Sequence, residues 1–158
     1  MEDRVHMTMG RKRLVRIITL LLIGMLLFIW KNSVESQAVS AARSGMVREW
    51  LEPFLEHFVG KGNVTDHLVR KLAHFAEYAL YGALLGAWLL AARRWKWRNV
   101  LYCLLIGLCT AGIDETIQIF TGRGPMVRDV LLDFSGVCCG VGTVWLVVLL
   151  AEGMRKRD

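Results

Sequence analysis

The residues of this sequence that could carry chemistry stand in three separated groups. The first is built around His74, which follows Lys71 by three residues and precedes Glu77 by three. Side chains three or four residues apart lie on one face of a helix, so these residues and Tyr78 share a broad face. The second and third groups lie later in the chain and consist of Asp114, Glu115 and Gln118, and of Arg123, Arg128, Asp129 and Asp133.

One interpretation of these groups is acid and base catalysis. His74 would carry a proton near neutral pH, and Glu77 or Glu115 would be tuned by burial. An arginine would stabilise charge that develops on a phosphoryl or acyl group. No nucleophile motif such as G-x-S-x-G occurs, so the sequence does not decide whether the protein is an enzyme. The candidate catalytic residues are His74, Glu77, Asp114 and Glu115.

A second interpretation is recognition of an anion. Lys71, Arg123 and Arg128 would hold a phosphate or carboxylate, because a guanidinium offers a planar, bidentate fork to such groups. The neighbouring carboxylates would orient these bases. The candidate substrate-binding residues are Lys71, Tyr78, Gln118, Arg123, Arg128, Asp129 and Asp133.

Two further interpretations compete with these. His74 and Glu77, with carboxylates from other helices, resemble the ligands of a metal site in a helix bundle. We nevertheless predict no metal and no cofactor, because only one histidine lies within a membrane segment and the nearby Lys and Arg would repel a cation. The cluster could also be purely structural, with buried ion pairs that fix the bundle.

The elements that must position these groups are helices of membrane length. Hydrophobic residues make up 54% of the 158-residue chain, and a membrane helix needs about 20 apolar residues. Four runs approach that length, at 14–30, 72–92, 99–120 and 130–151. We therefore expect one domain over residues 1–158, an all-α polytopic integral membrane protein with four transmembrane helices and one amphipathic outer helix. A cleaved signal peptide is the alternative for the first run, but this run is longer than the usual apolar region of about 7–15 residues.

Basic residues predict how these helices are oriented. They gather before the first run, between the second and third at residues 93–98, and after the fourth. Because short basic segments stay in the cytoplasm, both termini should be cytoplasmic and the three polar groups should meet at the outer face. The net charge of +6 is then a topology signal, and we expect no nucleic acid as a partner.

The outer segment, residues 31–70, contains an amphipathic pattern. Apolar residues from Met46 to Val59 recur at helical spacing, with charged residues opposite. The apolar stripe should be buried, either in the membrane interface or as a lid on the bundle. Pro53 should bend or break this helix, and Thr65 or Asp66 should cap the next one.

Small residues predict where two helices approach closely. Gly82 with Gly86, and Gly136 with Gly140, have the four-residue spacing that lets membrane helices touch. The four cysteines lie inside the apolar runs without metal-type spacing and are expected to be small apolar fillers.

The polar groups also carry a family resemblance, to the VanZ-like family of bacterial membrane proteins. It spans roughly residues 70–140 and includes Arg70, Lys71, His74, Glu77, Tyr78, Asp114, Glu115, Gln118, Arg123, Arg128, Asp129, Asp133 and Gly136. The resemblance implies a multi-pass protein of the bacterial cell membrane, whose namesake is linked to resistance to the glycopeptide teicoplanin.

From this resemblance and the polar groups we expect an envelope protein that engages an anionic membrane lipid or a lipid-linked cell-wall precursor at the outer leaflet. A membrane-embedded enzyme at the same face is one alternative. A structural or partner-binding membrane subunit is the other.

Overall fold

A computed structural model of the protein describes residues 8–121 and 126–155. Over these two ranges the chain forms helices and no strand, which confirms the predicted all-α class. The five helices are α1 (Met9–Val34), α2 (Gln37–Val59), α3 (Asp66–Ala91), α4 (Trp97–Phe120) and α5 (Val127–Arg155).

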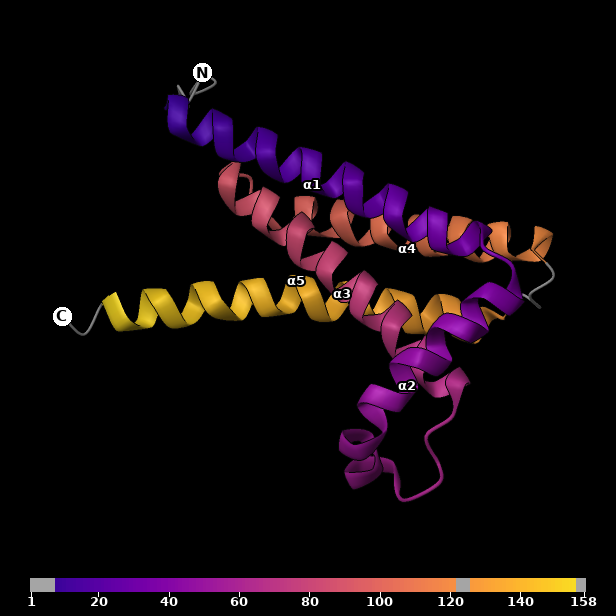
Figure 1. Ribbon diagram of the computed structural model, residues 1–158. Helices are drawn as coiled ribbons and strands as arrows, with labels where there is room; N and C mark the ends of the chain where they lie inside the picture. The colour runs from indigo at the N-terminus through magenta and orange to yellow at the C-terminus, as the bar shows by residue number, and fades with distance from the viewer. Residues whose placement is uncertain (1–7, 122–125, 156–158) are drawn as a thin grey trace.

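Helix α3 is the centre of the bundle. It packs against each of the other four helices, and most extensively against α5. Figure 1 shows α3 crossing between α5 and the neighbouring pair of α1 and α4. Its inner face contributes Tyr78, Tyr81, Leu85 and Leu89 to the core, where they meet Ile29, Cys103 and Val137.

Polar contacts at both ends of α1 and α3 fix these two helices in an antiparallel arrangement. At one end, Arg11 Nε donates to the carbonyl of Ala91 at 2.8 Å, and Trp88 Nε1 donates to Thr19 Oγ1 at 3.1 Å. At the other end, Asn32 Nδ2 donates to Glu77 Oε1 at 3.0 Å. The polar first half of α3 therefore faces the last turns of α1.

The glycines predicted to mediate close packing lie where α3 meets α5. A Cβ added at Gly82 would lie 2.3 Å from the carbonyl oxygen of Val137, and one at Gly140 would lie 2.0 Å from that of Ala79. Both distances are far below a normal contact, so the two backbones touch directly at these positions. Gly136 makes the same kind of contact with the carbonyl of Phe75, and Gly86 packs on Val144.

Three of the helices, α1, α4 and α5, are long and apolar enough to cross a membrane. Their bounds extend the runs predicted at 14–30, 99–120 and 130–151 by several residues at most ends. Helix α3 covers the predicted run at 72–92 except its last residue. It falls outside this set because its first half carries the charged and polar groups of the His74 motif. It is also the helix most enclosed by the others, so it needs less apolar surface of its own.

Helix α2 projects away from the other helices (Figure 1). It does not break at Pro53, and Ser36 and Gly60 flank its two ends. Its large apolar side chains are exposed, with Trp50 at 88%, Phe58 at 73% and Phe54 at 63%. The apolar stripe therefore does not pack on the bundle as a lid. Its contact with α3 includes an ion pair, between Arg48 Nη1 and Asp66 Oδ1 at 3.0 Å.

The start of α3 follows the sequence closely. Thr65 Oγ1 accepts a hydrogen bond from the backbone N–H of Leu68 at 3.1 Å, which is the capping interaction predicted there. The chain reaches this point through Gly60 and Gly62, whose φ values of 86° and 76° suit glycine. The cap sets where α3 begins, and so places His74 two turns inside it.

Candidate functional site

The three polar groups meet at one end of the bundle, around a cavity of about 180 Å3. Helix α3 supplies one wall, α4 a second, and α5 with the residue before it a third. A cavity needs only about 15 Å3 to hold one water molecule, so this space is large enough for a small polar group. The lining residues are His67, Arg70, Lys71, His74, Glu115, Gln118, Met126, Asp129, Leu132 and Asp133.

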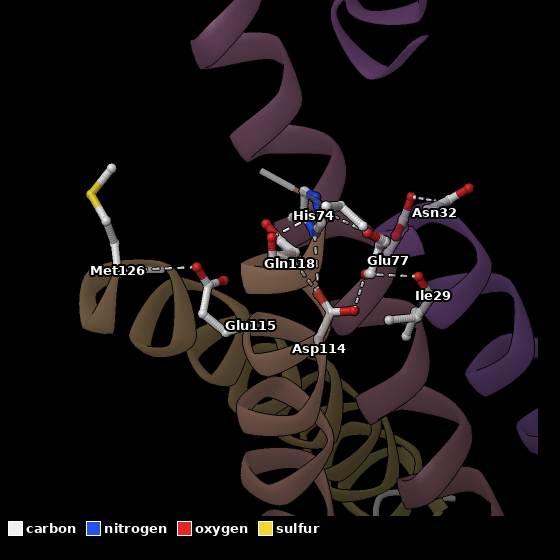
Figure 2. Close-up of polar contacts among 10 residues, drawn as sticks. Ile29, Asn32, His74, Glu77, Asp114, Glu115, Gln118 and Met126 are labelled. Atoms are coloured by element: carbon white, nitrogen blue, oxygen red, sulfur yellow. Dashed lines mark hydrogen bonds and ion pairs between the residues drawn. The ribbon is translucent and has the colours of Figure 1, made fainter. Parts of the chain in front are cut away.

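Asp114 is the most deeply buried acid of the site, with no exposed surface. Its Oδ2 accepts a hydrogen bond from Gln118 Nε2 at 3.1 Å, and its Oδ1 accepts one from the hydroxyl of Ser33. His74 Nδ1 lies 3.9 Å from Asp114 Oδ2 (Figure 2). These contacts hold the carboxylate between α1, α3 and its own helix, α4.

Asp133, on α5, is also buried, with 2% of its surface exposed. Within the described part of the chain, its Oδ1 has no hydrogen-bond partner. One ligand atom from each of His74, Asp114 and Asp133 can be chosen so that all three lie within 4.8 Å of one another. Three helices thus bring an imidazole and two buried carboxylates to one point.

Two of the acids stabilise the walls of the cavity. Glu115 Oε1 accepts a hydrogen bond from the backbone N–H of Met126 at 2.9 Å, which ties α4 to the residue before α5. Asp129 Oδ1 lies 2.8 Å from Lys71 Nζ and ties α5 to α3. Figure 2 shows the contact between Glu115 and Met126 on the side of the site away from Glu77.

Glu77 points toward α1 and does not line the cavity. Its Oε1 accepts from Asn32, whose own carbonyl oxygen accepts from Arg43 Nη1 at 3.2 Å. Arg43 Nη2 lies 2.6 Å from Glu35 Oε1. A series of polar contacts therefore connects the exposed first part of α2, through the end of α1, to the inside of the bundle.

The structure brings together most, but not all, of the residues that the sequence singled out. Around the cavity or directly behind it lie Lys71, His74, Asp114, Glu115, Gln118, Asp129 and Asp133. Tyr78 is enclosed in the core, and Arg128 is exposed and does not line the cavity. Arg123 lies outside the described residues.

Four residues of the site were not among the predicted site residues. Ser33 and Asn32 come from α1, and His67 and Arg70 come from the first turns of α3. Arg70 stands directly before Lys71, and its Nη2 lies 3.0 Å from His67 Nδ1. A signal for the α1 pair was present, because Asn32 and Ser33 directly follow an apolar run and are predicted to lie at the same membrane face as the other polar groups.

The protein has long apolar helices around a polar cavity. It therefore belongs to the class of helical proteins that are suited to a membrane. Within that class, the sequence profile of the VanZ/LLP1 family matches residues 17–149, and the chain belongs to this family. The comparisons found no match among curated proteins and none among solved structures.

Proposed function

We propose that this protein is a multi-pass bacterial membrane protein that binds an anionic headgroup, of a membrane lipid or a lipid-linked cell-wall precursor, in the cavity between α3, α4 and α5. In this proposal α3 crosses the membrane as a fourth helix, shielded by its neighbours. Both termini are cytoplasmic and the cavity lies at the outer leaflet. The cellular consequence is reduced susceptibility to teicoplanin, as family membership suggests.

One observation carries this proposal: the cavity has two adjacent cationic side chains, Arg70 and Lys71, on its α3 wall. Lys71 is about a third exposed, at 31% of its side chain, and so remains accessible beside its partner Asp129. Cationic donors bind phosphate through short, charge-assisted hydrogen bonds. Gln118 and His74 line the same cavity and can add hydrogen bonds to the same headgroup.

The test compares two lipids that share one isoprenoid chain and differ only in the phosphate group. Full-length protein in detergent is titrated with undecaprenyl phosphate and with undecaprenol, and bound lipid is counted by native mass spectrometry. Undecaprenyl phosphate should bind more tightly. The double variant Arg70→Gln, Lys71→Met should lose at least about tenfold in affinity, since each charge-assisted hydrogen bond contributes about 1.5–3 kcal/mol.

The matched control removes two exposed cations from the opposite end of the bundle, Lys96 and Arg98. The variant Lys96→Met, Arg98→Gln should bind like the wild type. Equal affinity for the two lipids, or an unchanged affinity in the folded Arg70 and Lys71 variant, would contradict the proposal. A change in the mass of the bound lipid during incubation would instead favour an enzyme at the same site.

A further inference from the structure

We propose that His74, Asp114 and Asp133 bind a divalent transition-metal ion at the inner wall of the cavity. This inference goes beyond the proposed function, because the ion can bind whether or not an anionic lipid enters. Each ligand comes from a different helix, α3, α4 and α5, and the three ligand atoms lie within 4.8 Å of one another. Ligand atoms around one tetrahedral Zn2+ are about 3.4 Å apart, given metal–ligand distances of about 2.0–2.2 Å. Side-chain rotations that bring these atoms up to about 1.4 Å closer together would reach the spacing of a bound ion.

The buried carboxylate of Asp133 is an independent indication of a ligand. It is 2% exposed, and among the described residues its Oδ1 has no hydrogen-bond partner. A carboxylate removed from water is costly unless it is paired or coordinates a metal. A cation between Asp133, His74 and Asp114 satisfies this oxygen without any change in the fold.

The charges of the site fit a dication. With a neutral imidazole, the two carboxylates give the ligand set a net charge of −2. We expected no metal from the sequence because neighbouring basic residues would repel a cation. In the structure, Lys71 is paired with Asp129 at 2.8 Å and Arg128 is exposed. Of the basic residues near the ligands, Lys71 is therefore balanced by Asp129 and Arg128 lies at the surface. Arg70 also lines the cavity, where its Nη2 lies 3.0 Å from His67 Nδ1.

The surroundings also suit coordination. Metal-binding carboxylates are usually oriented by hydrogen bonds from a second layer of residues. Asp114 receives such bonds from Ser33 and from Gln118. One imidazole nitrogen and two carboxylate oxygens are ligands that Zn2+ and similar ions accept. Three protein ligands leave a fourth position, and because His74 and Asp133 line the cavity, that position faces the space where the anion would lie.

The experiment needs no lipid substrate, so its outcome is separate from that of the proposed function. Full-length protein in detergent is stripped with EDTA, exchanged into chelator-free buffer and titrated with ZnCl2 by calorimetry, and bound zinc is counted by mass spectrometry. We expect one Zn2+ per chain. His74→Ala and Asp133→Asn should each weaken binding by more than about tenfold. His57→Ala is the control, because His57 is exposed and lies on α2.

Thermal unfolding with and without Zn2+ is a second, independent measurement of metal binding. Zn2+ should raise the Tm of the wild type and of His57→Ala but not of Asp133→Asn, since a ligand stabilises only a state that binds it. In EDTA, Asp133→Asn should be at least as stable as the wild type, because it replaces a buried carboxyl group, whose Oδ1 has no partner among the described residues, with a neutral amide of the same shape. A folded wild type that binds no stoichiometric zinc, or folded His74 and Asp133 variants with wild-type affinity, would overturn the inference.

Discussion

Asp114 shows how a single buried acid organises the site. The carboxylate has no exposed surface, and its two oxygens accept hydrogen bonds from Ser33 on α1 and Gln118 on α4. Buried charges are tolerated only where such partners are present. Ser33 is itself fully buried. If its hydroxyl were removed, water could take its place beside Asp114 only if the surrounding side chains moved.

Removing the Ser33 hydroxyl should therefore destabilise the protein. Ser33→Ala should lower the free energy of unfolding by about 1.5–3 kcal/mol, the usual contribution of a hydrogen bond to a charged group. Ser135→Ala is the control, because Ser135 is exposed and its hydroxyl donates to the carbonyl of Leu132, one turn back on the same helix. Denaturant unfolding in detergent checks both variants, and an equal effect of the two would show that the Asp114 contact adds nothing.

At the scale of residues, the sequence predicted which side chains gather but not how each one points. Helix direction and distance from the helix end were enough to bring His74, Glu115 and Asp133 to one place. The rotation of each helix about its axis decides the rest. Glu77 lies one turn from His74, yet it faces α1 and bonds Asn32. Asn32 and Ser33 of α1 were not predicted, because they belong to no motif and only their place after an apolar run pointed to the same membrane face.

Among the elements, close packing at the glycines was predicted, but the sequence did not say which helices would meet there. Two glycine pairs at four-residue spacing indicated close helices, and three of those four glycines are where the backbones of α3 and α5 touch, while Gly86 packs on the side chain of Val144. For α2 the sequence left two outcomes, an apolar stripe in the membrane interface or a lid on the bundle. Helical periodicity shows that an apolar stripe exists but not what covers it. Trp50, Phe54 and Phe58 turned out to face away from the bundle, as suits a membrane interface.

Glycine substitutions on α5 test the contact directly. Gly140→Ala places a methyl group 2.0 Å from the Ala79 carbonyl oxygen and must push α3 and α5 apart. We expect a loss of stability of about 1–3 kcal/mol or more, as for overpacked cores. Gly142→Ala, two residues on, meets nothing within 4 Å and should be neutral or slightly stabilising. Thermal unfolding in detergent compares them, and a similar Tm for both would contradict the backbone contact.

For the whole molecule, the distribution of basic residues predicts the orientation, and cysteine labelling in intact cells tests it. A cysteine at Asn63, in the exposed link between α2 and α3, should react with an impermeant maleimide added outside. A cysteine at Lys96, in the link between α3 and α4, should react only after the cells are opened. The wild type is the control, since its four cysteines lie within helices. The reverse pattern would put the cavity at the cytoplasmic face and exclude an outer-leaflet ligand.

Helices α3 and α5 meet backbone to backbone, so neither can turn or slide along the other without breaking several glycine contacts. They form a fixed frame around two sides of the cavity. The third side, α4, is held by side chains instead: Glu115 bonds the backbone of Met126, and Asp114 bonds Ser33. Side-chain contacts can be exchanged one at a time, whereas touching backbones cannot. Under the proposed function, α4 is therefore the wall that we expect to move, and a lipid would enter the cavity from the bilayer along one of its edges.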